Sequence, residues 1–392
     1  MKKIFFLIIF FFPFLCRAQQ TFTMNQGIVK LPGYYTEIGY ENVRDKIIIK
    51  AVIGEKTYRF IVDTGAPTMI TQNLFDELKL AVLKKLEIND ANGSADSLIV
   101  TNISEIKLGD VMFNDIPALV DKDPLIFNCH KVDGFIGSNL LRNSIISFSF
   151  KDHKLILTDQ VEKLSLNKKQ SADLILNKAQ SSPFIDIKLA GSKSGTLKVL
   201  FDSGMEGLLD ISLKHYAILE KKNIFTLIGH AMGNSTLGVN GIGRDTSQYR
   251  LNVKAMNING ALLKNVTMQT TASDNSRIGS ELLHYGTLTL DYINKLFYFN
   301  PYTDNIDITK KVFPISVTIK DKKLIVALIW DENLQKELSV NDQILFVDDK
   351  DYSNIDPCEF IVGNSIFEGK NKLVITVKNK KGEIKKVEIQ KV

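Results

Sequence analysis

Two short motifs of the sequence contain an aspartate that could take part in acid–base chemistry. They are Asp63-Thr64-Gly65 and Asp202-Ser203-Gly204, and each follows an apolar run. Two carboxyl groups held about 3 Å apart share one proton, because both cannot ionise without a large electrostatic cost. One carboxyl can then act as a base toward water while the other acts as an acid toward a carbonyl oxygen. The two motifs therefore predict hydrolysis of an amide bond, provided that the fold brings Asp63 and Asp202 together.

Each aspartate lies where a predicted strand turns into a glycine-containing loop. Residues 58–62 and 197–201 are rich in β-branched, aromatic and aliphatic side chains, as is typical of strands. After each aspartate, Thr64 or Ser203 can fix the loop through its hydroxyl group, while Gly65 and Gly204 allow the backbone to approach the carboxylates. We therefore assign these four residues to loop support and the aspartates to catalysis.

The surroundings of the two motifs repeat in the same order. A strand-like segment and a polar turn precede each motif, and the segment 135–141 corresponds to 277–283. Gly137 follows Asp63 by 74 residues, and Gly279 follows Asp202 by 77. Matched features at nearly equal spacing indicate a duplicated unit. In each unit the isoleucine before this glycine is expected to pack behind the aspartate loop, and the glycine to leave room for the crossing.

The doubled pattern resembles the retropepsin-like aspartic proteases in their single-chain, two-lobed form. The resemblance extends from about residue 40 to about residue 300. It implies a mostly β fold with two homologous closed β-barrel-like lobes, at 19–160 and 161–309, and Asp63 and Asp202 facing one cleft. It also implies polypeptide substrates, no cofactor, no metal, and a monomer whose lobes form an intramolecular pseudo-dimer.

Two positions are compared with the family pattern, namely Ala66 and Met205, where Ala, Ser or Thr is usual. Neither side chain has a hydroxyl group that could donate a hydrogen bond to its carboxylate, and a carboxylate with fewer hydrogen-bond donors holds its proton more tightly. We therefore expect an activity optimum less acidic than that of stomach-type relatives, and a maximum below about pH 3 would contradict this reasoning. Met205 also leaves open an alternative, a catalytically inactive protein that binds peptides with the same cleft and with the C-terminal segment 310–392.

Proteases of this type carry hairpins that fold over the substrate. In the first half, the flap candidates are Asp90, Asn92 and Gly93, which lie in turn-forming sequence between two apolar runs. In the second half, the corresponding hairpin is expected within residues 229–243. That segment is rich in glycine but lacks the Lys-Ser/Thr of a phosphate-binding loop. Short helices are predicted after the aspartate loops; the predicted ranges are 71–86 and 212–223.

The last part of the chain, residues 310–392, resembles a bacterial PDZ-like domain, a small α+β fold. The segment 337–348 carries most of the likeness, although Asn341 stands where glycine is usual. Two roles remain open at this point. The segment is either a β-rich module that packs on the protease or a docking site for extended peptide ends.

The beginning of the chain predicts export. Met1-Lys2-Lys3 is basic, residues 4–15 are apolar, and Ala18 ends a plausible cleavage site, so residues 1–18 are interpreted as a signal peptide. An apolar run of this length is shorter than the roughly 20 residues of a membrane span, so we expect no stable membrane insertion. The protein is expected in the periplasm or secreted. Without residues 1–18, basic and acidic residues nearly balance, which gives no electrostatic case for nucleic acid.

Cysteine and histidine give no sign of other chemistry. Cys129 and Cys358 are far apart in the sequence; two buried thiols are favoured, and a disulfide between them in an oxidising compartment is the open alternative. Neither a cysteine cluster nor a His-Glu-x-x-His spacing suggests a metal site. A Gly-x-Ser-x-Gly elbow is also missing, so a serine hydrolase lacks its main sequence signal.

Overall fold

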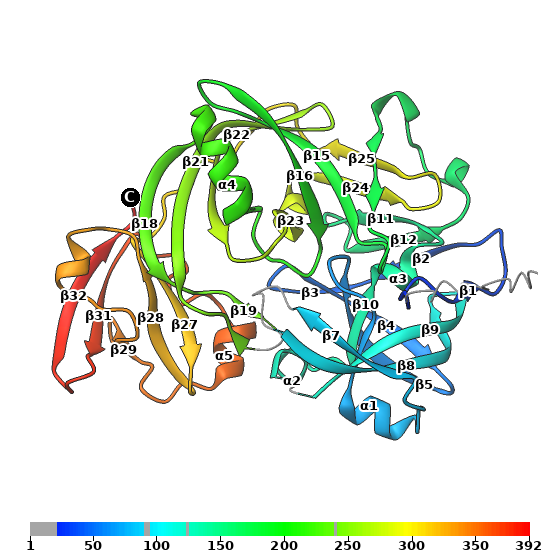
Figure 1. The fold of residues 1–392 in the computed structure, drawn as a ribbon, viewed down its shortest axis with the longest axis horizontal. Coiled ribbons are helices and arrows are strands. Elements are labelled where there is room, and N and C mark those ends of the chain that lie inside the picture. The colour runs from blue at the N-terminus through cyan, green and yellow to red at the C-terminus, as the bar shows by residue number, and fades with distance from the viewer. Residues whose placement is uncertain (1–21, 90–94, 123–124, 239–240) are drawn as a thin grey trace, which may run out of the picture.

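The computed structural model describes residues 22–89, 95–122, 125–238 and 241–392. The predicted signal peptide and the flap candidates Asp90, Asn92 and Gly93 lie outside the described residues. Figure 1 shows a first barrel in blue to teal, a second barrel in green to yellow, and a C-terminal module in orange to red.

The first barrel is a ring of six strands. The hydrogen-bonded path runs β9, β6, β10, β5, β4, β8, and the pairing of β8 with β9 closes it. In β4, Ile47, Ile49 and Ala51 are buried in the main core and Lys50 is exposed, as the two-residue period of a strand requires. The ring consists of β4 (Lys46–Ile53), β5 (Lys56–Asp63), β6 (Met69–Thr71), β8 (Ala95–Leu108), β9 (Val111–Asp121) and β10 (Gly134–Gly137). At its margins lie β1 (Ile28–Val29), β3 (Glu41–Val43) and β7 (Lys84–Asn89).

The second barrel repeats this order of pairing. Its path runs β22, β17, β23, β16, β15, β21, and antiparallel pairs between β21 and β22 and between β15 and β21 complete the ring. The ring consists of β15 (Pro183–Ala190), β16 (Ser194–Asp202), β17 (Leu209–Ser212), β21 (Thr246–Ile258), β22 (Ala261–Thr271) and β23 (Arg277–Gly279). At its margins lie β14 (Ile175–Leu176), β18 (Thr226–Gly233) and β26 (Ile306–Asp307), and a separate hairpin joins β19 (Leu237–Gly238) to β20 (Gly241–Ile242).

A third sheet joins the two halves of the chain. Its order is β13, β25, β24, β11, β12, β2, so that each half contributes a hairpin to the centre. The central pair β11 and β24 is antiparallel, with Ile145 opposite Asp291 and Phe148 opposite Leu288. The strands are β2 (Tyr35–Gly39), β11 (Ile145–Ser149), β12 (Lys154–Thr158), β13 (Ala172–Asp173), β24 (Gly286–Asp291) and β25 (Leu296–Pro301). Because this sheet is shared, buried side chains of both barrels form one continuous core.

The helices after the two aspartate loops differ in length from each other. In the second half, α4 (Leu213–Leu219) and a 3-10 turn (Glu220–Lys222) occupy the predicted range, with Ser212 as N-cap and Asn223 in the left-handed region at the end. In the first half, the prediction of a helix over 71–86 was wrong beyond residue 77, because α1 (Gln72–Glu77) ends there. Residues 84–89 instead pair with β8 as β7, and over the last residues of the predicted range this pairing overrides local helix propensity.

Other short helices connect the strands of the barrels. They are α2 (Leu125–His130), α3 (Ser138–Leu141) and the 3-10 turns Val161–Lys163, Lys168–Gln170 and Ser280–His284. Among the described residues, none of the helices is long and apolar enough to span a membrane.

The C-terminal module, residues 310–392, has its own sheet and its own hydrophobic core. Its sheet contains β27 (Ile315–Lys320), β28 (Lys323–Ile329), β29 (Gln343–Val347), β30 (Lys350–Asp351), β31 (Lys372–Lys378) and β32 (Ile384–Gln390), with α5 (Pro357–Val362) and the 3-10 turn Leu334–Lys336 beside it. Asn341 has a φ of 73°, a left-handed conformation that asparagine tolerates better than most residues. The backbone therefore explains how asparagine can replace the expected glycine.

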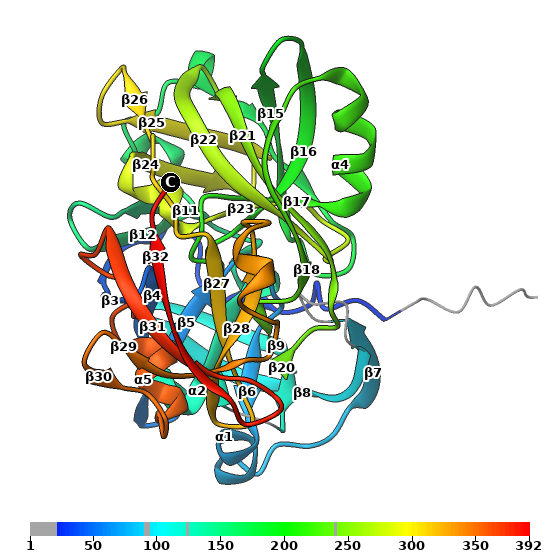
Figure 2. The same cartoon turned by 90° about the vertical axis from the view of Figure 1, so that its left-hand side faces the viewer.

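The C-terminal module is attached to both barrels. Cys129 of α2 and Cys358 of α5 form a disulfide, so the expectation of two free thiols was wrong. The fold places α2 against α5 although 229 residues separate the two cysteines, and sequence distance gave no indication of this contact. On the other side, β28 packs against β18 of the second barrel (Figure 2). Ala231, Leu328 and Trp330 form a small buried cluster there.

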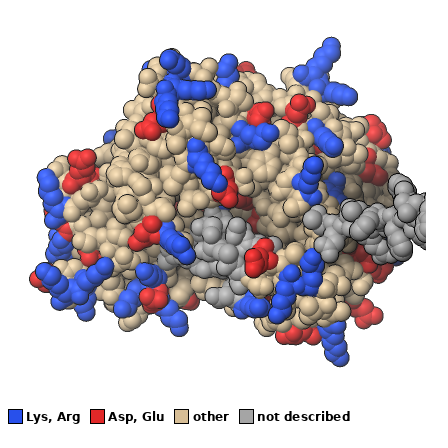
Figure 3. Space-filling model, viewed as in Figure 1, with Lys and Arg blue, Asp and Glu red and all other residues tan. Residues whose placement is uncertain are grey.

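Charged side chains are interspersed on the surface. Figure 3 shows lysine and arginine side chains among aspartate and glutamate side chains on one face of the molecule. The chain as a whole has 49 basic and 44 acidic residues, so the mixed face matches the composition.

Candidate active site

Asp63 and Asp202 occupy equivalent positions at the ends of two strands. Asp63 ends β5, which runs parallel to β10 with Asp63 opposite Gly137. Asp202 ends β16, which runs parallel to β23 with Asp202 opposite Gly279. The two residues are 9% and 8% exposed, so both carboxyl groups are nearly removed from solvent while remaining reachable. This environment favours proton sharing, because a buried carboxylate resists ionisation.

Crossed hydrogen bonds hold the two aspartate loops against each other. The Thr64 hydroxyl donates to the Phe201 carbonyl at 2.7 Å and accepts from the Ser203 N–H at 3.0 Å. The Ser203 hydroxyl makes the mirror-image contacts, donating to the Val62 carbonyl at 2.8 Å and accepting from the Thr64 N–H at 3.0 Å. All four bonds connect one barrel with the other. The two hydroxyl groups therefore fix the loops of both halves in one arrangement.

Each glycine of the motifs lies against the carboxyl group of the opposite half. A Cβ atom on Gly65 would lie 2.6 Å from Asp202 Cγ, and a Cβ atom on Gly204 would lie 2.3 Å from Asp63 Oδ2. Both distances are too short for any larger residue. The structure thus brings Asp63, Asp202 and all four support residues into one site.

The segments behind the loops also have matching contacts. Ile136 and Ile278 are fully buried, and a Cβ atom on Gly137 or Gly279 would lie 2.2 Å from backbone atoms of the loop it crosses. These contacts confirm that the two glycines leave room for the crossing.

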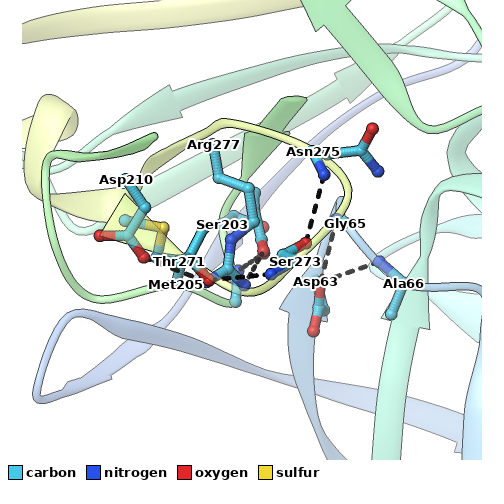
Figure 4. A network of polar contacts seen from close by, with 12 residues as sticks. Asp63, Gly65, Ala66, Ser203, Met205, Asp210, Thr271, Ser273, Asn275 and Arg277 are labelled. Carbon is cyan, nitrogen blue, oxygen red and sulfur yellow. Dashed lines mark hydrogen bonds and ion pairs between the residues drawn. The ribbon is translucent and has the colours of Figure 1, made fainter. Parts of the chain in front are cut away.

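The carboxyl group of Asp63 is held by backbone N–H groups (Figure 4). Its Oδ1 atom accepts from the Gly65 N–H at 2.9 Å and from the Ala66 N–H at 3.0 Å, so the backbone of Ala66 supplies a donor that its side chain lacks. Burial, followed by the negative charge of Asp202, raises the pKa of Asp63 to about 7. Lys46 and the two N–H groups oppose this increase.

Asp202 has a different set of partners, and one of them, Arg277, was not among the site residues predicted from the sequence. Its Oδ1 atom accepts from the Gly204 N–H at 3.0 Å, while its Oδ2 atom lies 3.4 Å from Arg277 Nη1. Arg277 also donates from Nη2 to Asp210 Oδ2 at 3.1 Å, as Figure 4 shows. Burial opposes the charge of this guanidinium, but the carboxylates of Asp210 and Asp202 outweigh burial and raise the pKa of Arg277.

The arginine could have been noticed as a difference between the two repeats. Position 277 corresponds to Phe135 in the first half, so a charged residue stands where the repeat has an aromatic one. Its partner Asp210 lies directly opposite on the neighbouring strand β17. That pairing depends on the fold, and sequence spacing does not reveal it.

A second cationic contact reaches the site from the start of β4 and the turn before it. Lys46 Nζ donates to the Gly204 carbonyl and lies 4.0 Å from Glu206. Arg44 in that turn donates to Glu206 at 3.2 Å and to the Phe360 carbonyl of α5 at 2.7 Å. This turn therefore connects the second aspartate loop with the C-terminal module.

Both segments in which flap hairpins are predicted adjoin antiparallel strand pairs. β7 and β8 form an antiparallel pair, and the first-half candidates fall between them in the sequence, outside the described residues. In the second half, β18 pairs with β21, and the hairpin of β19 and β20 lies between them in the chain. β18 is exposed at Leu227, Ile228 and Met232.

Comparison with known families gives one match. A family model described as "Aspartyl protease" matches residues 49–140, which include Asp63 and the crossing segment with Gly137. A search of curated proteins found no match. The matched part, which comprises most of the first barrel, is therefore similar to an aspartyl protease.

Proposed function

We propose that this chain is an aspartic endopeptidase in which Asp63 and Asp202 activate water between two barrels of one polypeptide. The observation that carries the proposal is the crossed hydrogen bonding of Thr64 and Ser203, because it fixes the carboxyl-bearing loops of both halves in one site. The aspartyl protease match over the first barrel supports the same conclusion.

In the proposed mechanism the two carboxyl groups share one proton and a water molecule binds between them. As the water oxygen bonds to the peptide carbonyl carbon, the ionised carboxyl takes a proton from water and the protonated carboxyl gives one to the carbonyl oxygen. The tetrahedral intermediate then collapses. The C–N bond breaks, the amine nitrogen takes the first proton, and a hydroxyl group of the intermediate returns the second. The dyad therefore ends in its starting state.

The proposed mechanism requires one proton on the dyad, which sets limits on the active pH range. Because the pKa of Asp63 is about 7, the proton is retained through mildly acidic pH and lost above neutrality. We therefore expect activity to decline on the alkaline side at about pH 7, in line with an optimum less acidic than that of stomach-type enzymes.

We further propose that the two barrels correspond to the lobes of a retropepsin-like monomer, and the C-terminal module to a PDZ-like domain. The repeated strand order supports the first assignment. The five longer strands with α5 and the left-handed Asn341 support the second.

Export is proposed from the basic and apolar beginning of the chain, and the disulfide suits an oxidising compartment. Mass spectrometry of the mature protein tests this last point, since cleavage after Ala18 would leave Gln19 as the first residue.

The central experiment is a cleavage assay with purified protein lacking residues 1–18. A diverse peptide mixture is incubated at several values between about pH 3 and pH 8, and products are identified by mass spectrometry. Wild type is expected to cut internal peptide bonds, and Asp63→Asn and Asp202→Asn to lose at least about a thousandfold in kcat/KM. The matched control is Asp110→Asn, because that side chain is 90% exposed and its ion-pair partner is Lys107 rather than a residue of the dyad. No cleavage by folded wild type at any pH, or equal cleavage by all variants, would refute the proposed function.

A further inference from the structure

The two halves of the site repeat in backbone but differ in charge. Asp63 has two backbone N–H groups on Oδ1, and its Oδ2 atom faces the Gly204 loop of the other half. Asp202 has one backbone N–H group and, in addition, a guanidinium nitrogen within 3.4 Å of Oδ2. A cation at this distance favours the ionised form of the carboxyl that it contacts.

Arg277 is buried in the second barrel, where it contacts Asp202. Its side chain is only 7% exposed, and the facing side chains of Asp202 and Asp210 are 12% and 13% exposed. Asp210 lies opposite Arg277 on the adjacent antiparallel strand, so the backbone register itself sets the ion pair. A buried arginine without such a partner would carry a large desolvation cost. Asp210 therefore keeps Arg277 charged and holds it against Asp202.

The other charged groups around the dyad do not reverse the effect of Arg277, which favours the ionised form of Asp202. Lys46 lowers the pKa of Asp63. Its Nζ nevertheless donates its hydrogen bond to the Gly204 carbonyl and lies near Glu206 rather than on a dyad carboxylate. The negative charge of Asp210 acts on Asp202 from the far side of Arg277. Arg277 alone among these cations donates a hydrogen bond to a dyad carboxylate in the described part of the chain.

We propose that Arg277, oriented by Asp210, is a positioning residue that fixes the negative charge of the dyad on Asp202 and leaves the shared proton on Asp63. If the chain is a protease, as proposed above, Asp202 is the base that takes the proton from water. Asp63 is then the acid that protonates the carbonyl oxygen. In the second step Asp202 gives its proton to the amine nitrogen as the C–N bond breaks, and Asp63 takes back a proton from a hydroxyl group of the intermediate.

The first test uses the double variant Arg277→Gln/Asp210→Asn, which removes both charges together and so leaves neither one buried alone. We expect the acidic limb of the kcat/KM profile to move up by about one pH unit or more, because the cation that favours an ionised dyad is gone. KM should change little, since Arg277 is buried behind the carboxylates. The decrease of kcat/KM at acidic pH should therefore come from kcat. Arg277→Lys keeps a cation in the site and is expected to retain the wild-type acidic limb.

The matched control is Arg250→Gln. Arg250 is another largely buried arginine of the second barrel, but it donates to the Phe313 carbonyl and stacks on Trp330 rather than contacting the dyad. This control should keep the wild-type position of the acidic limb. A folded double variant whose acidic limb stays within about 0.3 pH unit of wild type would overturn the proposal. An equal shift in Arg277→Lys would also overturn it, because charge would then not be the cause.

A second test does not depend on cleavage. Aspartate carboxyl carbons are labelled with carbon-13, and NMR titration follows the dyad, with Asp63→Asn and Asp202→Asn assigning the two signals. The wild type is expected to show Asp202 ionised while Asp63 is protonated, and the double variant to bring the two titrations closer together. The same titration in both proteins would overturn the role of Arg277. If wild type cuts no peptide but shows the expected asymmetry, the proposed function fails while the charge assignment stands.

Discussion

The raised pKa of Asp63 makes a specific prediction about stability. Asp63 is protonated in both folded and unfolded chains below pH 3.8, the ordinary pKa of the group. Above that pH the unfolded chain releases the proton, whereas the folded protein retains it until about pH 7. The free energy of unfolding therefore falls as pH rises through this window. A difference of about three pH units corresponds to about 4 kcal/mol at most, at 1.36 kcal/mol per unit.

Asp63→Asn removes this titration, because the amide is neutral at every pH. We expect the variant to gain stability relative to wild type as pH rises, with a difference that grows by about 3 to 4 kcal/mol between pH 4 and pH 8. Urea unfolding followed by far-UV circular dichroism measures the difference at each pH. The control Asp110→Asn removes an exposed carboxylate and should keep a nearly constant difference from wild type. If the Asp63→Asn difference is equally constant, within about 1 kcal/mol, the account of Asp63 as a buried, proton-holding carboxyl is refuted.

Three further predictions concern the contacts that hold the site and the module. Thr64→Val removes a hydroxyl with two partners in the other barrel and should lower the free energy of unfolding by about 3 kcal/mol, measured by urea unfolding. Gly204→Ala should lower kcat/KM by about a hundredfold in a peptide cleavage assay, because its Cβ would collide with Asp63 Oδ2. Cys129→Ser/Cys358→Ser should lower stability by about 2 to 5 kcal/mol in thermal or urea unfolding, since the disulfide closes a long loop.

Each of these predictions has its own control. Thr64→Ser keeps the hydroxyl, so a loss equal to that of Thr64→Val would contradict the role of the crossed bonds. Gly39→Ala adds a methyl group where no atom lies within 4 Å, and an activity loss as large as that of Gly204→Ala would count against a local collision. Treating wild type with a reductant should reproduce the instability of the double serine variant. Unchanged unfolding of the reduced protein would show that the disulfide contributes little.

The sequence by itself determined the two aspartate loops and the repeat around them. Strand-forming runs, a hydroxyl residue and a glycine act locally, and the same local rules apply in both halves. Their spacing also predicted which crossing segment lies behind which loop, as the pairing of Asp63 with Gly137 and of Asp202 with Gly279 shows.

Only the tertiary structure decided which distant residues became neighbours. The Arg277 contact with Asp210 depends on the register of β17 against β23, and the disulfide depends on the packing of α5 against α2. The strand conformation of residues 84–86, where a helix was predicted, likewise depends on pairing with β8. These features come from contacts between segments far apart in the chain, and their free energies outweigh the local preferences that can be read along it.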